Sequence, residues 1–161
     1  MKVREIMATP PITVDPDLPV VEIARLLLAH RLPGAPVVDK QDVVLGVVTE
    51  ADLIARNANL HLPRFLTFID SLMPTSTSRE FDEEVRRMLA TSAREVMSEK
   101  FSSIVPDADV AEAATIMFER HANPLPVVEN GRLVGMLSST DLIRLMLLQE
   151  DASADTRAGQ E

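Results

Sequence analysis

Two short motifs in this sequence each place a hydroxyl side chain three residues before an aspartate. They are Thr49 with Asp52 and Ser138 with Asp141. In both, an apolar run typical of a strand ends at the hydroxyl residue and a helical pattern follows. The N–H groups and the dipole of a helix N-terminus favour an anion, and a carboxylate can accept two hydrogen bonds from a vicinal diol. The combination fits a ribose and a phosphate.

The same spacing also serves a purely structural purpose. A hydroxyl residue at the start of a helix and an acidic residue three positions later can cap that helix, and for one isolated copy this interpretation is the better one. The motif recurs, however, inside a longer duplication. Arg4-Glu5-Ile6-Met7 returns as Arg94-Glu95-Val96-Met97, an offset of 90, and Pro36-Val37-Val38 returns as Pro126-Val127-Val128. A duplication on this scale predicts two similar units about a pseudo-twofold axis, with two related sites.

The elements that would position the motifs follow one order in both copies: strand, helix, strand, strand, helix. In the first copy, Ile12 to Val14 is a short strand candidate, and further strands are expected at 35–38 and 43–48. In the second copy, Asn130-Gly131 suits a tight hairpin between the matching strands. A helix is expected directly after each hydroxyl residue.

Composition argues against several classes of function. The formal charge is −9, no basic tract is present and the aromatic residues are five Phe, which argues against a nucleic-acid surface. The absence of cysteine excludes disulfides, thiolate metal sites and cysteine nucleophiles. No signal-peptide pattern and no apolar run of about 18 residues is found. We expect a soluble cytoplasmic protein that binds neither nucleic acid nor a membrane.

Two segments lie outside the duplication. Residues 58–92 are expected to form a helical insertion that adds to the core or to a dimer contact, with a lid over a ligand as the alternative. Residues 150–161 lack apolar periodicity and are expected to be a disordered tail. The helix before that tail is apolar on almost every side from Leu142 to Leu148. Because such a helix needs cover on more than one face, a homodimer is predicted.

The duplicated motifs resemble the tandem cystathionine-β-synthase (CBS) domain pair, often called a Bateman module. The resemblance rests on the lead-in Arg-Glu-Ile-Met, the strand Pro36-Val37-Val38-Asp39 and the closing Gly-x-x-Thr-x-x-Asp, which recur in this order. It implies an α+β fold of two pseudo-symmetric CBS repeats, residues 1–57 and 93–149, with the helical insertion between them. Each repeat would be a small three-stranded sheet with two helices, and the repeats would pack sheet to sheet with two clefts between them.

The resemblance also implies which residues line the clefts, which in such modules commonly bind AMP, ADP, ATP or S-adenosylmethionine. One cleft would use Thr49 and Asp52, with Ser103, Ile104, Arg120 and His121 opposite. The other would use Ser138, Thr140 and Asp141, with Thr13, Val14, His30 and Arg31 opposite. In both, the hydroxyl and the aspartate would hold the ribose and phosphate side of a regulatory ligand. No metal and no other cofactor is implied.

The basic residues in these sets allow two interpretations. His30-Arg31 is similar to the phosphate-contacting stretch of the gamma subunit of AMP-activated kinase, and the second copy keeps the pair in swapped order as Arg120-His121. Basic residues that end a helix also complement its dipole with no ligand present. Glu50, beside Thr49, could repel a polyphosphate, whereas Ser139 in the matching place could not. The second cleft is therefore predicted to be the better anion site.

Catalysis has little support in the sequence. No Ser-His-Asp order or metal-ligand spacing stands out, and the three histidines are scattered. We expect a regulatory module, not an enzyme, that binds an adenine nucleotide or a related adenosyl ligand and signals to an effector protein in trans. The alternative is a dimeric interaction scaffold whose clefts stay empty.

Overall fold

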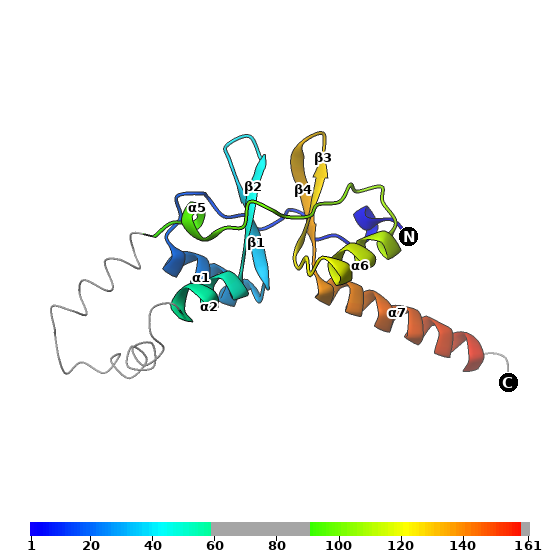
Figure 1. The fold of residues 1–161 in the computed structure, drawn as a ribbon. Helices are drawn as coiled ribbons and strands as arrows, with labels where there is room; N and C mark the ends of the chain where they lie inside the picture. The colour runs from blue at the N-terminus through cyan, green and yellow to red at the C-terminus, as the bar shows by residue number, and fades with distance from the viewer. Residues whose placement is uncertain (59–90, 159–161) are drawn as a thin grey trace, which may run out of the picture. The chain divides into compact units, whose positions relative to one another are not determined.

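Each repeat forms one β-hairpin, and the two hairpins belong to two different compact units of the chain (Figure 1). The computed structural model describes residues 1–58 and 91–158, with the side chains of 1–56 and 91–150. The helical insertion expected at 58–92 therefore lies almost entirely outside the described residues. We call residues 12–100 the N-repeat unit, and residues 1–11 together with 101–161 the C-repeat unit.

The N-repeat unit contains a small sheet with helices that follow and precede it. Its elements are α1 (Val20–His30), β1 (Gly34–Val38), β2 (Val44–Thr49), α2 (Glu50–Ala58) and the short α5 (Ala93–Val96). β1 and β2 pair antiparallel. Val14 adds a parallel bridge beside Val37, and Ser98 adds an antiparallel bridge beside Val47. The strand expected at Ile12 to Val14 is thus a single bridging residue at the sheet edge.

The C-repeat unit repeats this plan. Its elements are the 3-10 helix η1 (Val3–Glu5), α6 (Val110–Glu119), β3 (Leu125–Glu129), β4 (Arg132–Leu137) and α7 (Ser139–Ala158). β3 and β4 pair antiparallel, and bridges at Ile104 and Ala8 extend the sheet at its two edges. Asn130 and Gly131 have φ angles of 52° and 79°, as a tight hairpin turn requires. The predicted α+β fold is confirmed.

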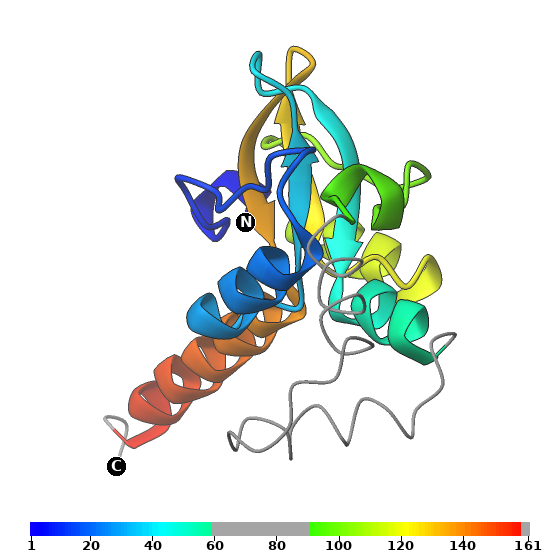
Figure 2. The ribbon, with the colours of Figure 1, turned by 90° about the vertical axis from the view of Figure 1, so that its left-hand side faces the viewer.

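The last helix is longer than apolar periodicity suggested. α7 runs past Glu150 to Ala158, as one continuous helix in Figure 2, into the segment expected to be a disordered tail. A helix that has already begun gains one hydrogen bond for each residue added, so it can continue where no apolar face requires it.

Each sheet is completed by the lead-in segment of the other repeat. In the C-repeat unit, the N–H of Ala8 donates to the carbonyl oxygen of Met136 at 2.8 Å, and the N–H of Met136 donates back at 3.1 Å. In the N-repeat unit, Ser98 and Val47 exchange the same two bonds at 2.9 and 3.1 Å. Each compact unit therefore consists of the hairpin and helices of one repeat together with the lead-in segment of the other repeat.

Glycine allows these exchanged segments to approach the sheets closely. A Cβ atom added at Gly46 would lie 2.8 Å from the carbonyl oxygen of Ser98, and one added at Gly135 would lie 2.5 Å from the sulfur of Met7. Both are closer than non-bonded atoms allow. The glycine that opens each Gly-x-x-Thr/Ser-x-x-Asp motif is thus explained by packing, independently of any ligand.

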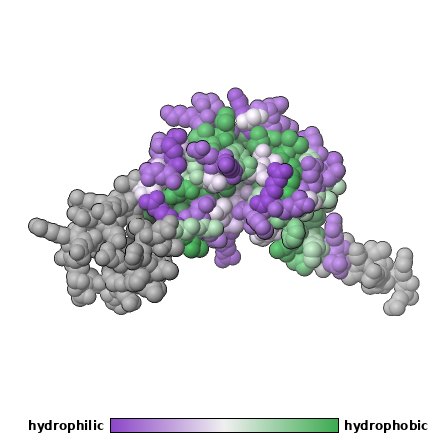
Figure 3. All heavy atoms as spheres, in the orientation of Figure 1, coloured by the Kyte–Doolittle hydropathy of each residue, from purple (hydrophilic) through white to green (hydrophobic). Residues whose placement is uncertain are grey.

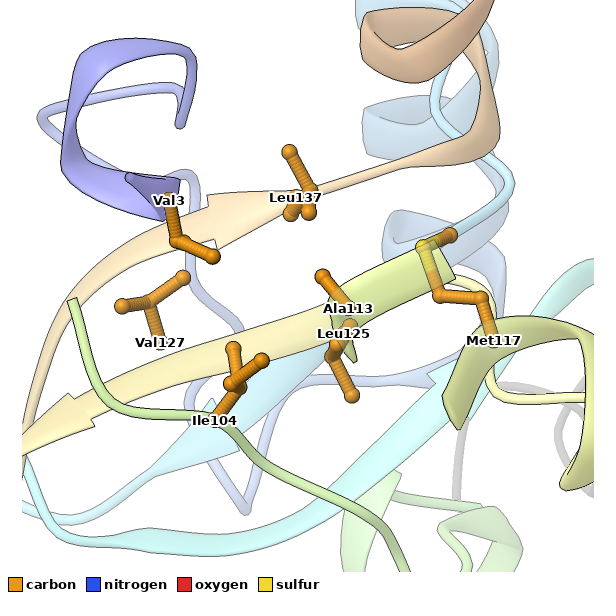
Figure 4. Close-up of a cluster of buried hydrophobic side chains, with 7 residues drawn as sticks. All are labelled: Val3, Ile104, Ala113, Met117, Leu125, Val127 and Leu137. Carbon is orange, nitrogen blue, oxygen red and sulfur yellow. The ribbon is translucent and has the colours of Figure 1, made fainter. Parts of the chain in front are cut away.

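Each unit has its own cluster of buried apolar side chains, built from equivalent positions. The cluster of the N-repeat unit consists of Val14, Ile23, Leu27, Ala35, Val37, Val48 and Ala93. The equivalent residues of the C-repeat unit, in the same order, are Ile104, Ala113, Met117, Leu125, Val127, Leu137 and Val3, and Figure 4 shows this second cluster. Size is exchanged at two of these positions, because Ile23 and Ala35 correspond to Ala113 and Leu125. Such compensation keeps the volume of a core nearly constant.

Ion pairs hold the N-terminal segment on the C-repeat unit. Lys2 Nζ lies 2.9 Å from Asp109 Oδ1, and Arg4 lies 2.7 Å from Asp107 and 3.7 Å from Glu129. The hydrogen bond from Lys2, and then its charge, lower the pKa of Asp109, while the hydrogen bond to Asp109 raises the pKa of Lys2. Both side chains are exposed, so salt should weaken the pair.

We expect the Lys2–Asp109 ion pair to stabilise the folded state only at pH values where the Asp109 carboxyl is deprotonated and the Lys2 ammonium is protonated. Because the pKa of Asp109 is lower in the folded state, its contribution is present above the unfolded-state pKa and is lost as the pH falls through the folded-state value. Because the pKa of Lys2 is higher in the folded state, its contribution is present below the unfolded-state pKa and is lost as the pH rises through the folded-state value. An NMR titration of the Asp109 carboxyl should show the lowered pKa, and Lys2→Gln should return it to the ordinary range. An unchanged pKa in Lys2→Gln would contradict this assignment.

Candidate functional site

The first hydroxyl–aspartate motif lies at the junction of β2 and α2. Thr49 is the last residue of β2, and its N–H and its Oγ1 hydroxyl both donate to Asp52 Oδ2, each at 2.8 Å. The N–H of Asp52 donates back to Thr49 Oγ1 at 3.3 Å. These are the reciprocal bonds of a capped helix. Both side chains are half-buried.

The second motif, between β4 and α7, repeats the two bonds to the aspartate, but the N–H of Asp141 donates to the backbone carbonyl oxygen of Ser138 at 3.1 Å. The N–H and the Oγ hydroxyl of Ser138 donate to Asp141 Oδ2 at 2.8 and 2.7 Å. The reciprocal capping bonds are therefore complete in the first copy, and the second copy has the half in which the aspartate accepts from the residue before the helix. Capping does not exhaust either carboxylate, because in both motifs these bonds go to Oδ2 and Oδ1 takes no part in them.

The helix N-termini offer an anion fewer free donors than the sequence suggested. The N–H of Glu50, the first residue of α2, donates to the carbonyl oxygen of Pro33 at 3.0 Å. At the matching place, the N–H of Ser139 donates to Asn123 Oδ1 at 3.1 Å. Because the first N–H group of each helix already has a protein partner, any phosphate must rely more on side chains than on the helix ends.

The lead-in residues predicted to face the motifs divide into buried and exposed members. Val14 and Ile104 are 0% and 6% exposed, and the N–H and carbonyl groups of both bond within their own sheets. Their side chains are therefore part of the core. Thr13 and Ser103, which precede them, are exposed and available to a ligand. Thr140 is likewise exposed, in the first turn of α7.

The four predicted basic residues lie at the ends of α1 and α6 and are all exposed. Arg31 and His121 occupy matching positions with left-handed φ angles of 53° and 51°. The next residues, Leu32 and Ala122, donate back to Leu27 and Met117, which is the bonding of a helix end that usually takes glycine.

A side chain in this conformation costs about 1 kcal/mol, yet the first copy has an arginine there and the second a histidine. Within the described part of the chain, none of His30, Arg31, Arg120 and His121 forms an ion pair.

Two polar residues beside the second motif were not predicted. Arg144 Nη1 donates to Asp141 Oδ1 at 3.2 Å, and Asn123 Nδ2 donates to Ser139 Oγ at 2.9 Å. Arg144 could have been found from its helical i, i+3 spacing to Asp141. Asn123 lies 16 residues from Ser139, so no local pattern connects them.

Metal and membrane features are absent from the described residues. No group of three His, Cys, Asp or Glu side chains there could hold a metal ion. Of the helices in those residues, none is both long and apolar enough to cross a membrane.

The structure defines a duplicated α+β unit with a hydroxyl–aspartate pair at each strand-to-helix junction. The model of the CBS domain family matches residues 3–59 and 93–148. The chain therefore belongs to the CBS domain family and carries a tandem pair of these domains, which confirms the identification made from the sequence.

Two relatives match along nearly their whole length. An uncharacterized protein of Methanocaldococcus jannaschii is 31% identical over 155 residues, covering 91% of this chain and 92% of that protein. The CBS domain-containing protein YhcV of Bacillus subtilis is 26% identical over 152 residues, covering 94% of this chain and 90% of YhcV.

Solved structures of CBS domain pairs share the fold. The CBS domain pair of protein MJ0100, in complex with 5′-methylthioadenosine and S-adenosyl-L-methionine, has a TM-score of 0.70 at 22% identity, with 92% and 98% of the two chains covered. CBSX2 in complex with AMP has a TM-score of 0.68 at 22% identity, with the same shares covered.

Proposed function

We propose that this chain is a regulatory ligand-sensing module that binds an adenine nucleotide or a related adenosyl compound. The observation that carries the proposal is the duplicated hydroxyl–aspartate pair, with matching geometry in both copies. Oδ1 of each aspartate, which at Asp141 also accepts from Arg144, can accept from a ribose diol, and the exposed basic side chains at the ends of α1 and α6 can bind phosphate. Support also comes from two CBS pairs of similar fold that were solved with AMP and with S-adenosylmethionine.

The proposed binding residues are the two sets predicted from the sequence. Thr49 and Asp52 would act with Ser103, Ile104, Arg120 and His121. Ser138, Thr140 and Asp141 would act with Thr13, Val14, His30 and Arg31. Because the side chains of Val14 and Ile104 are in the core, we propose that they shape the site and that Thr13 and Ser103 make its polar contacts.

Thermal unfolding against a panel of ligands tests the proposal. The panel is AMP, ADP, ATP, NAD and S-adenosylmethionine, with GMP as the control. A ligand at 100 times its dissociation constant stabilises the folded state by about 2.7 kcal/mol, which is several degrees for a chain of this size. A shift with an adenosyl compound and none with GMP is expected. No shift with any member of the panel would contradict the proposal.

Signalling would arise because the ligand binds one conformation of the chain more tightly than another. A ligand that prefers one arrangement of the chain shifts the population toward it, and an effector protein that distinguishes the arrangements reads the change. The module would therefore act in trans and would need no catalytic group of its own.

The alternative is an interaction scaffold whose sites stay empty. One observation favours it: Thr49 and Asp52, like Ser138 and Asp141, already satisfy each other without a ligand. The same thermal experiment separates the two functions, because a scaffold of this kind gains no stability from adenosyl compounds.

We further propose that the chain forms a homodimer through α7. Ile143, Met146, Leu147 and Leu148 are each 58–63% exposed, and Figure 3 shows apolar side chains along the first part of this helix. Large apolar side chains gathered on one helix are typical of an interface. The sequence-based expectation of a dimer thus rests on side chains that the fold leaves uncovered.

Ile143→Glu combined with Met146→Glu is expected to halve the mass measured by sedimentation equilibrium, because a charge buried in an interface is strongly unfavourable. Val43→Glu is the matched control, since Val43 is also exposed, at 40%, but lies in the turn of the first hairpin. A dimer that survives the double change, or a monomeric wild type, would contradict this interface.

A further inference from the structure

The two hydroxyl–aspartate motifs share their geometry but differ in the charges around them. Asp141 Oδ1 accepts a hydrogen bond from Arg144 Nη1 at 3.2 Å, which also pairs the two charges. The residue that matches Arg144 in the first copy is Ala55. In the described part of the chain, no group bonds to Asp52 Oδ1. The first carboxylate is therefore not neutralised by a described neighbour, whereas the second is.

The first residues of the two helices increase this difference. The first turn of α2 carries two acidic residues, Glu50 and Asp52, and that of α7 carries Asp141 alone. Glu50 is exposed. In its place the second copy has Ser139, whose hydroxyl accepts from Asn123 Nδ2 at 2.9 Å. The first motif thus adds an anion where the second adds a neutral amide and hydroxyl pair.

The charge difference acts oppositely on different adenosyl compounds. A phosphate group is repelled by carboxylates, and a sulfonium or ammonium group is attracted by them. At the partly exposed distances of such a site, one unit charge changes an affinity by roughly threefold to tenfold. Within the described residues, neither Glu50 nor Asp52 forms an ion pair, whereas Asp141 is paired with the guanidinium of Arg144. Arg120 and Arg31, which are proposed to act with the first and the second motif, add one positive charge to each and leave this difference unchanged. The two motifs should therefore prefer different ligands.

We propose that the motifs sort adenosyl ligands by charge: the Asp141 motif binds phosphorylated compounds, and the Asp52 motif binds cationic ones. Arg144 is the positioning residue, because it acts by neutralising Asp141 and occupying one of its oxygens. This inference rests on the proposed function. It goes further by assigning one class of ligand to each motif, so that a single chain would respond to two chemical signals.

Equilibrium dialysis with AMP and S-adenosylmethionine on single-site variants tests this assignment. Asp52→Asn should weaken the binding of S-adenosylmethionine much more than that of AMP, and Asp141→Asn should weaken the binding of AMP much more than that of S-adenosylmethionine. In the Asp52→Asn background, Arg144→Gln should weaken AMP binding about threefold to tenfold, and Arg144→Lys should restore most of it, because the charge is what matters. A merely structural role for Arg144 would not be rescued by lysine.

The reciprocal change is Glu50→Ser combined with Ala55→Arg, which places the charges of the second motif on the first. In the Asp141→Asn background this variant should gain AMP affinity and lose S-adenosylmethionine affinity. Equal effects of each aspartate variant on both ligands would overturn the sorting and leave the proposed function intact. Absence of binding of either ligand to the wild-type chain would overturn both.

Discussion

Replacing Asp52 and Asp141 together by asparagine is expected to abolish stabilisation by adenosyl ligands. Asparagine keeps the size of the side chain and can still accept the capping bond from Thr49 or Ser138. It removes the charge and turns one acceptor oxygen into a donor, so a ribose diol loses its charge-assisted bonds, worth about 1.5–3 kcal/mol each. Affinity should fall about 100-fold or more, which follows from a loss of about 2.7 kcal/mol.

The ligand-induced shift should be measured relative to the melting temperature of the unliganded variant, because weakening the two helix caps itself costs about 0.5–2 kcal/mol each. The matched control is Asp17→Asn with Asp107→Asn. These residues are also equivalent in the two repeats, they are exposed, and they carry the same charge change. The control should keep the wild-type ligand response. A wild-type response in the Asp52 and Asp141 variant would exclude both motifs from binding.

Exchanging a large and a small side chain in the N-repeat core is expected to show strong coupling. Ile23 is fully buried, so Ile23→Ala should cost about 2–4 kcal/mol in the free energy of unfolding. Ala35→Leu alone should cost about 1–3 kcal/mol by overpacking. The C-repeat core already has the opposite arrangement, Ala113 with Leu125. The double variant should therefore recover at least about 1 kcal/mol relative to the sum of the single changes.

Urea unfolding of the single and double variants measures this coupling. Ile23→Ala combined with Ala29→Leu is the control, because it has the same change in composition but Ala29 is exposed. No recovery is expected there. Additive costs for the Ile23 and Ala35 changes would mean that the two cores, although built from equivalent positions, are not packed alike.

The sequence predicted the hairpins and the junctions because their signals are local. The strands expected at 35–38 and 43–48 correspond to β1 and β2, and Asn130-Gly131 forms the expected tight turn. The duplication strengthened each assignment, since a pattern seen twice at one offset is hard to attribute to chance. The bonds within each hydroxyl–aspartate motif could be expected for the same reason, because they span only three residues.

The exchange of the lead-in segments could not be predicted from the same patterns. An internal repeat says which residues are equivalent, but not which copy a segment packs against. Met7 and Met97 are equivalent in sequence, and their contacts with Gly135 and Gly46 become visible only in three dimensions. The asymmetry between the motifs was missed for a similar reason. Asn123 contacts Ser139 only in the folded chain. Arg144 lies within one helical turn of Asp141, but a search for repeated residues passes over it because its equivalent in the first copy is Ala55.

Direct binding of a labelled adenosyl compound to the full chain tests the central claim most closely. Equilibrium dialysis with AMP and, separately, with S-adenosylmethionine should show saturable binding that unlabelled adenosyl compounds displace and GMP does not. The Asp52→Asn and Asp141→Asn double variant should show none. Absence of saturable binding of either compound to the wild-type chain, at concentrations up to the millimolar range, would contradict the account and favour the empty scaffold.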